Sequence, residues 1–390
     1  MTFNAEKYLA NSIKSIPPSG IRKFFDLVSQ MKGVISLGVG EPDFVTPWHI
    51  REASVYSLEK GYTMYTSNYG MPELRKAIAC YLTKRYNVEY DYTNEIIVTI
   101  GASEAVDLAA RAILEPGDEV LIPEPCYVSY KPCVELAGGV AVMLPTSVEN
   151  EFRVTAEEIE KHITKRTKAI ILSYPNNPTG AIMPLNDMLP IVNAVRKHDL
   201  LVISDEIYSE LTYDGAHTAF SSLPGMKDRT ILINGFSKAF AMTGWRVGYL
   251  AAHPEFIKHM VKIHQYGILC APVMGQMAAV EALKNGMPEV EHMKESYNQR
   301  RNLVVSRLRD IGLDVFEPKG AFYAFPSIKK TGLDAETFAE KLLEEEKVAV
   351  VPGNAFGNSG EGFIRLSYAS SVANLDEAFK RMDRFLKRRL

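Results

Sequence analysis

Short apolar runs alternate with amphipathic, helix-like segments through the middle of the chain. Six runs are expected to be buried strands: residues 95–100, 119–122, 168–173, 200–204, 230–234 and 247–251. Because parallel strands are joined by helical crossovers, this alternation predicts an α/β fold with a largely parallel sheet flanked by helices.

The pattern changes after about residue 288. Two long charged helices are expected at 289–309 and 334–346, followed by short strands at 348–351 and 363–367 and a terminal helix from Asn374. Their charges are most simply explained as solvated helix faces. This part of the chain is expected to form a second, α+β domain.

Composition excludes several classes of function. The chain has 390 residues, 46% of them hydrophobic, enough for a large core and two domains. A net charge of −3 gives no electrostatic case for binding nucleic acid or an anionic membrane. The four cysteines form neither a CxxC motif nor a cluster with histidine, so no disulfide framework or metal site is expected. Residues 1–14 lack the apolar core of a signal peptide, and a cytoplasmic location is expected.

One lysine lies in an otherwise apolar, small-residue segment, residues 235–248. Burying an ammonium group is costly, so the pKa of Lys238 is expected to fall and its amine to become nucleophilic. Schiff-base chemistry with a carbonyl compound or pyridoxal phosphate (PLP) requires such an amine. Taken alone, Lys238 is better explained as one of the many surface charges, so partners elsewhere must support the assignment.

Polar side chains follow the end of an expected strand. Asp205 ends the run 200–204, and Tyr208 follows three residues later. Because open α/β sheets bind ligands at the carboxyl ends of their strands, Asp205 is well placed to pair with a pyridine nitrogen. Taken alone, Asp205 is equally well explained as a helix cap or as a salt-bridged acid.

A phosphate site is expected where the strand 95–100 meets a helical pattern. Small residues at this turn (Gly101, Ala102 and Ser103) let a phosphate approach the free N–H groups and the positive end of the helix. Arg246 would add a bidentate donor.

Two further side chains follow strand ends. Asn177 is a fixed donor for an anionic oxygen, and the Tyr127 ring is placed to lie on a pyridine face. As turn residues alone, the Asn-Pro and Pro-Thr-Gly sequences here need no function.

In order and spacing, these motifs resemble the class I/II aminotransferases of PLP fold type I, including bacterial and archaeal alanine, aspartate and aromatic aminotransferases. The resemblance runs nearly end to end, from residues 38–43 to 365–368. It implies a large PLP-binding domain (48–287) with a mostly parallel seven-stranded sheet between helices. It also implies a smaller α+β domain (288–390), joined by an N-terminal arm segment (1–47).

The resemblance implies a role for each motif residue. Lys238 holds the cofactor as a Schiff base and, once released, moves the substrate Cα proton. The cofactor ring is held by Asp205 at the pyridine nitrogen, by Asn177 and Tyr208 at the ring oxygen, and by Tyr127, which stacks on the ring. The phosphate is held by Gly101, Ala102, Ser103 and Arg246, and by Tyr65 from a neighbouring subunit, while Arg365, with Gly40 and Asn177, binds the substrate carboxylate. Arg365 also fits independently, because a planar guanidinium binds carboxylates bidentately.

One position departs from the family pattern. Many relatives carry serine or threonine three residues before the lysine as a phosphate donor, whereas this chain has Gly235. Ser237 is expected to take part instead.

The implied reaction is ping-pong transfer of an amino group from an L-amino acid to a 2-oxo acid such as 2-oxoglutarate, by a homodimer with shared sites. In dicarboxylate-specific relatives, an arginine of the neighbouring subunit recognises the distal carboxylate, but the corresponding stretch 266–272 has no base. Either Arg22 or Lys23 binds the distal carboxylate, or the donor is neutral. Both residues lie beside an arm at 17–20 that is expected to close the cleft. Alanine or another neutral donor is favoured, with aspartate and aromatic donors left open.

Two alternatives use the same fold. A PLP-dependent C–S β-lyase would also use the lysine as a base, and sequence separates it poorly from an aminotransferase. A PLP-binding transcriptional regulator would need a basic DNA-binding module, but only about forty residues precede Gly40, without a helix-turn-helix pattern.

Overall fold

The computed structural model describes residues 3–18 and 31–389. Within them, a seven-stranded sheet has the order β2-β8-β7-β6-β5-β3-β4. Its strands are β2 (Ile96–Thr99), β3 (Glu119–Glu124), β4 (Val140–Pro145), β5 (Thr167–Ser173), β6 (Leu201–Asp205), β7 (Thr230–Gly235) and β8 (Gly248–Ala251). β8 alone runs opposite to the other six strands of this sheet. The predicted α/β fold with a mostly parallel sheet is confirmed.

All six strands predicted for this sheet are present, and their ends differ from the predicted ones by at most two residues. The seventh, β4, was not predicted individually. It is an edge strand that pairs with β3 alone. Its apolar run is short, and periodicity alone does not distinguish such a run from a helical segment.

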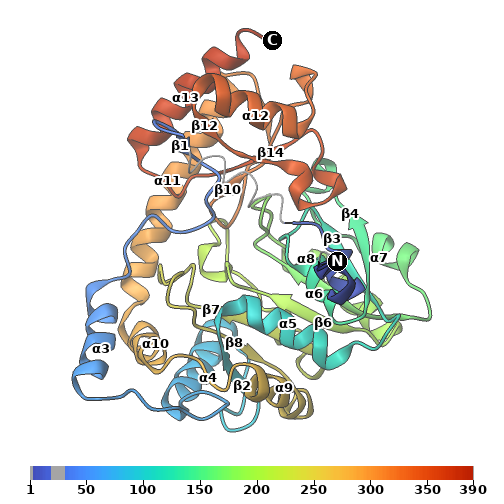
Figure 1. Cartoon of the computed structure of the whole chain (residues 1–390), viewed down its shortest axis with the longest axis vertical. Coiled ribbons are helices and arrows are strands. Elements are labelled where there is room, and N and C mark those ends of the chain that lie inside the picture. The colour runs from blue at the N-terminus through green and yellow to red at the C-terminus, as the bar shows by residue number, and fades with distance from the viewer. Residues whose placement is uncertain (1–2, 19–30, 390) are drawn as a thin grey trace.

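Helices cover both faces of the sheet (Figure 1). Alternate side chains of one strand point to opposite faces. Ile171 of β5 packs in the cluster that includes α5 (Gly101–Ile113), α6 (Tyr130–Leu136) and α9 (Pro254–Gly267). Ile170 packs in the cluster on the other face with α7 (Ala156–His162) and α8 (Leu185–Lys197). Burial on both faces explains why these strands are continuous apolar runs.

A third group of helices packs beside β2 and β8. It consists of α3 (Trp48–Glu59), α4 (Pro72–Tyr86) and α10 (Val273–Asn285). Each helix in the described parts of the chain is too short or too polar to cross a bilayer. The cytoplasmic location stays a prediction.

The C-terminal region lies at the top of Figure 1. Its helices are α11 (Met287–Asp310), α12 (Ala335–Glu346) and α13 (Val372–Leu386), and its short strands are β9 (Asp314–Val315), β10 (Tyr323–Ala324), β11 (Pro326–Ser327), β12 (Val348–Ala349), β13 (Val351–Pro352) and β14 (Ile364–Ser367). The N-terminal strand β1 (Ile35–Ser36) pairs with β12, so segments far apart in sequence share this region. The domain boundaries at 47 and 287 stay predictions.

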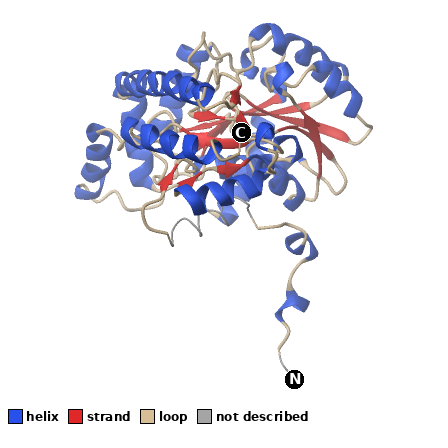
Figure 2. Ribbon diagram, turned by 90° about the horizontal axis from the view of Figure 1, so that it is seen from above, coloured by secondary structure: helices blue, strands red, loops and turns tan. Residues whose placement is uncertain are grey.

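The first described residues form a 3₁₀ turn (Ala5–Tyr8) and a short helix α1 (Asn11–Lys14). Figure 2 shows them extending away from the body of the molecule. The predicted arm at 17–20 falls partly, and Arg22 and Lys23 entirely, outside the described residues.

Candidate active site

A cavity of about 300 Å³ lies where the carboxyl ends of β2, β3, β5, β6 and β7 meet. Its wall contains most of the residues singled out from the sequence: Gly40, Ala102, Ser103, Tyr127, Asn177, Asp205, Tyr208, Ser237, Lys238, Arg246 and Arg365. The volume suits a small ligand. Gly101 lies directly behind the wall, against the Arg246 guanidinium. Tyr65 is not in this wall, and its side chain is 83% exposed.

Lys238 is held inside the cavity by a backbone oxygen. Its Nζ donates to the carbonyl oxygen of Gly40 over 2.6 Å. Burial, followed by the nearby Arg365 cation, lowers the pKa of Lys238 to about 8. About a tenth of this amine is therefore free base at pH 7, far more than for an exposed lysine, and a nucleophile and proton carrier requires that form.

Asp205 is buried at the end of β6. Its Oδ2 accepts a hydrogen bond from the Tyr130 hydroxyl (2.7 Å) and its Oδ1 one from the Ile207 N–H (3.2 Å). Burial raises the pKa of Asp205 to about 6. A cationic N–H group in the cavity would offset that cost, as a protonated pyridine nitrogen does. Tyr130 was not predicted, although it lies three residues from Tyr127 and their rings meet edge to face.

The Tyr208 hydroxyl has a neighbour that the sequence reasoning missed. It is hydrogen-bonded to the Tyr323 hydroxyl at 2.7 Å, and both side chains are buried. Burial raises the pKa of both tyrosines, so both are neutral donors at physiological pH. Tyr323 comes from β10, and no local spacing connects it with Tyr208.

Arg365 is a buried cation whose contacts are all to uncharged groups. Its Nη1 donates to Asn177 Oδ1 (2.9 Å) and its Nη2 to the Gly38 carbonyl (2.6 Å). The guanidinium lies over the rings of Tyr323 and Phe356, at 4.5 and 4.8 Å. Its Nε has no hydrogen-bonding partner among the described residues. A buried cation in the wall of a cavity is suited to a carboxylate ligand.

Glycines let the predicted phosphate turn pack closely against β8 and Arg246. Gly101 has φ +72°, and a Cβ there would lie 2.5 Å from Nη2 of Arg246. A Cβ on Gly248 would lie 2.5 Å from the carbonyl carbon of Gly101. Gly235 faces Gly248 across the β7–β8 pair, and its Cβ would lie 3.0 Å from the Gly248 Cα. The glycine that replaces serine or threonine at residue 235 therefore accompanies close packing of β7 against β8.

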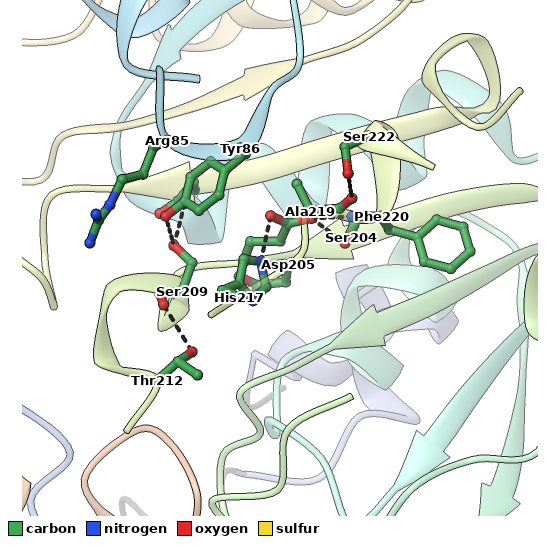
Figure 3. A network of polar contacts seen from close by, with 12 residues as sticks. Arg85, Tyr86, Ser204, Asp205, Ser209, Thr212, His217, Ala219, Phe220 and Ser222 are labelled. Atoms are coloured by element: carbon green, nitrogen blue, oxygen red, sulfur yellow. Dashed lines mark hydrogen bonds and ion pairs between the residues drawn. The ribbon is translucent and has the colours of Figure 1, made fainter. Parts of the chain in front are cut away.

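The turn that carries Asp205 and Tyr208 is held by a network of polar contacts (Figure 3). The buried Glu206 carboxylate accepts from Ser204 Oγ and the Phe220 N–H, and pairs with Nε2 of His217 at 2.9 Å. Further along the turn, the Tyr86 hydroxyl donates to Ser209 Oγ at 2.9 Å. These contacts restrict the turn on both sides of Tyr208. They were not predicted, because all but the Ser204–Glu206 contact join residues that are well separated in sequence.

Comparison with known proteins places this chain in a family. Residues 32–382 match the model of "Aminotransferase class I and II". YugH of Bacillus subtilis, whose name describes an aminotransferase of no stated substrate, is 56% identical over 97% of this chain and 98% of its own length. An aspartate aminotransferase of Pyrococcus abyssi is 48% identical over 97% of this chain and 98% of its own. The crystal structure of an aromatic aminotransferase from Pyrococcus horikoshii has a TM-score of 0.90 at 48% identity, covering 94% of this chain and 99% of its own.

The chain belongs to the aminotransferase class I and II family, with the PLP fold type I architecture. It is an aminotransferase, which confirms the family and the reaction class predicted from the sequence. These relatives favour amino transfer over the lyase and regulator alternatives. Their names cover more than one substrate class, so they do not define the donor of this chain.

Proposed function

We propose that this aminotransferase binds pyridoxal 5′-phosphate in the cavity beside Lys238. The donor set fits the cofactor: an acid for the pyridine nitrogen (Asp205), neutral donors for the ring oxygen (Asn177 and Tyr208), and a small-residue turn with Arg246 for the phosphate. When bound, PLP supplies an electron sink for the electron pair left on the substrate Cα.

The residues of the chain supply binding, orientation and proton transfer. Arg365 would hold the α-carboxylate, so that the Cα–H bond is presented to Lys238. The Lys238 amine would take the proton from Cα and deliver it to C4′ of the cofactor, on the other side of the substrate nitrogen. Asp205, as a carboxylate, would keep the pyridine nitrogen protonated throughout, and Tyr127 would hold the ring flat against the site. The same groups would act in reverse on the 2-oxo acid, giving ping-pong amino transfer.

The cations of the cavity wall support a neutral amino donor, with alanine the favoured example. Among the described residues, the wall contains three cations, Lys238, Arg246 and Arg365, and each already has a role. None of these remains for a distal substrate carboxylate, and residues 266–272 contain no base. An apolar pocket separates neutral side chains by only about 1–3 kcal/mol per methylene, so several donors are expected. The proposed acceptor is a 2-oxo acid such as 2-oxoglutarate.

The half-reaction with single amino acids tests the donor class. With PLP bound and no 2-oxo acid present, alanine is expected to convert the cofactor to its amine form faster than aspartate at equal, subsaturating concentration. Rapid-mixing absorbance spectroscopy measures both rates. A higher kcat/KM for aspartate would show that another residue binds the distal carboxylate and would overturn the neutral-donor assignment.

We also propose a homodimer with shared sites. A group of exposed apolar side chains supports it: Trp48, Tyr62, Met64, Tyr65, Tyr266 and Ile268. The loop of Tyr65 and the end of α9 are joined by a hydrogen bond from Asn68 Nδ2 to the Leu269 carbonyl (2.8 Å). Clustered, exposed apolar side chains are typical of protein interfaces.

Tyr65→Phe is expected to weaken PLP binding by about tenfold, because the neighbour's phosphate would lose a hydrogen bond to a charged group. The thermal midpoint of the protein without PLP should not change. Equilibrium dialysis measures the affinity, with Tyr8→Phe on the exposed N-terminal segment as the control. Unchanged PLP affinity in Tyr65→Phe would remove the reason for a shared site.

A further inference from the structure

We propose that His264 is a positioning residue for the phosphate turn, residues 100–103, and that it acts through Glu104. The inference rests on the proposed binding of the PLP phosphate at this turn. His264 lies near the end of α9, whereas Glu104 lies in the first turn of α5.

A short chain of contacts carries the inference. Glu104 Oε1 lies 2.6 Å from Nδ1 of His264, and Glu104 Oε2 accepts the backbone N–H of Ile100 at 2.5 Å. The His264 side chain is fully buried, and that of Glu104 is 11% exposed. The histidine therefore fixes one carboxylate oxygen while the other fixes the peptide that enters the phosphate turn.

The following peptide, between Ile100 and Gly101, is held as well. The Ile100 carbonyl lies 3.5 Å from Nη2 of Arg246, the expected phosphate ligand. The next residue, Gly101, has φ +72°, so the orientation of this peptide decides where the following N–H groups point. Glu104 holds the peptide before Ile100 and Arg246 holds the peptide after it, so together they set that orientation. Loss of the Glu104 contact should therefore disturb phosphate binding before it disturbs the rest of the cavity.

The ring of His264 has one polar contact to make. Its Nε2 is buried and has no hydrogen-bonding partner among the described residues. The ring therefore makes its hydrogen bond through Nδ1, whose N–H donates to Glu104, because a carboxylate oxygen accepts. Without that donor, a largely buried carboxylate would retain only the Ile100 N–H.

The same helix end is tied to the loop that carries Tyr65. The His264 carbonyl accepts from the N–H groups of Ile268 (2.8 Å) and Leu269 (3.0 Å), and the Leu269 carbonyl accepts from Asn68. His264 thus connects the phosphate turn of its own protomer with the loop proposed to reach the phosphate of the neighbour. A substitution keeps these backbone bonds and removes only the side-chain contact to Glu104, so it should affect phosphate binding more than ring binding.

The test compares PLP with pyridoxal, which lacks the phosphate, in binding to the protein without cofactor. His264→Phe keeps the ring volume but removes the donor. Its dissociation constant for PLP is expected to rise by about tenfold, as for a lost hydrogen bond to a charged group, while that for pyridoxal changes by less than about twofold. His264→Asn should restore most of the PLP affinity, because its amide nitrogen takes the place of Nδ1. His259→Phe, on the exposed side of the same helix, is the matched control.

An equal weakening of PLP and pyridoxal in His264→Phe, or unchanged affinity for both, would overturn the inference. Glu104→Gln gives a second test if His264→Phe folds poorly, and the same selective loss is expected because its amide keeps only one oxygen. A different result is expected if the PLP phosphate does not bind at this turn at all. The unaltered protein would then bind PLP no more tightly than pyridoxal, whatever the variants do.

Discussion

Lys238→Ala is expected to lower kcat for amino transfer by about ten-thousand-fold or more, the largest effect of any single substitution in this chain. The lysine supplies both the covalent attachment point and the group that moves the Cα proton in the proposed mechanism. Its amine lies inside the cavity, 2.6 Å from the Gly40 carbonyl, and burial lowers its pKa to about 8. An alanine offers no proton carrier, and the part of the cavity wall that the structure describes has no second lysine.

The measurement is single-turnover conversion of alanine with PLP supplied in excess. PLP should still bind without a covalent bond, because Asp205, Arg246 and the phosphate turn remain. The spectrum of lysine-attached cofactor should be absent. Lys262→Ala, on the exposed face of α9, serves as the control. Turnover by Lys238→Ala within tenfold of the unaltered enzyme would show that a different group moves the proton.

Asp205→Asn is expected to lower kcat by about a thousandfold, comparable to the loss of a key electrostatic group in other active sites. The asparagine keeps nearly the same shape and can still accept from Tyr130 or Ile207. It carries no charge, however, so it cannot keep the pyridine nitrogen protonated. Steady-state kinetics on saturating substrate measure this loss, and a fall of less than tenfold would contradict the role of Asp205.

The same substitution should stabilise the protein without cofactor above about pH 6. Burial raises the pKa of Asp205 from 3.8 to about 6, so the folded protein holds this proton more tightly than the unfolded chain does. The free energy of unfolding therefore falls as pH rises from about 4 to 6, by up to about 3 kcal/mol. Asp205→Asn should lack this fall. Urea unfolding of both proteins at pH 4, 5, 6 and 7 measures it, and parallel pH profiles would contradict the expectation.

The predicted part of the site consists of residues that follow strand ends. The sequence predicts the positions of Asp205, Asn177 and Lys238 after strand ends, because the strands before them are buried on both faces and are therefore continuous apolar runs. Parallel strands bring such ends to one edge, so local sequence was sufficient to predict a common site. The seventh strand, β4, needed the family resemblance, because its short run has no distinctive period.

The residues that the sequence did not reveal act through tertiary contacts. Tyr323 reaches Tyr208 from another sheet, and His217 reaches Glu206 across a loop. His264 is an ordinary histidine on an amphipathic helix until α9 is packed against α5. Tyr130 is different, because its spacing of three from Tyr127 was a usable local signal.

Reduction of the PLP-loaded protein with borohydride, followed by peptide mass mapping, tests the central claim most directly. This treatment makes the bond between the cofactor and its lysine permanent. The account predicts one modified peptide, the one that contains Lys238, and no modification after alanine has first converted the bound cofactor to its amine form. Modification of a different lysine, or none with PLP in excess, would contradict the assignment of Lys238.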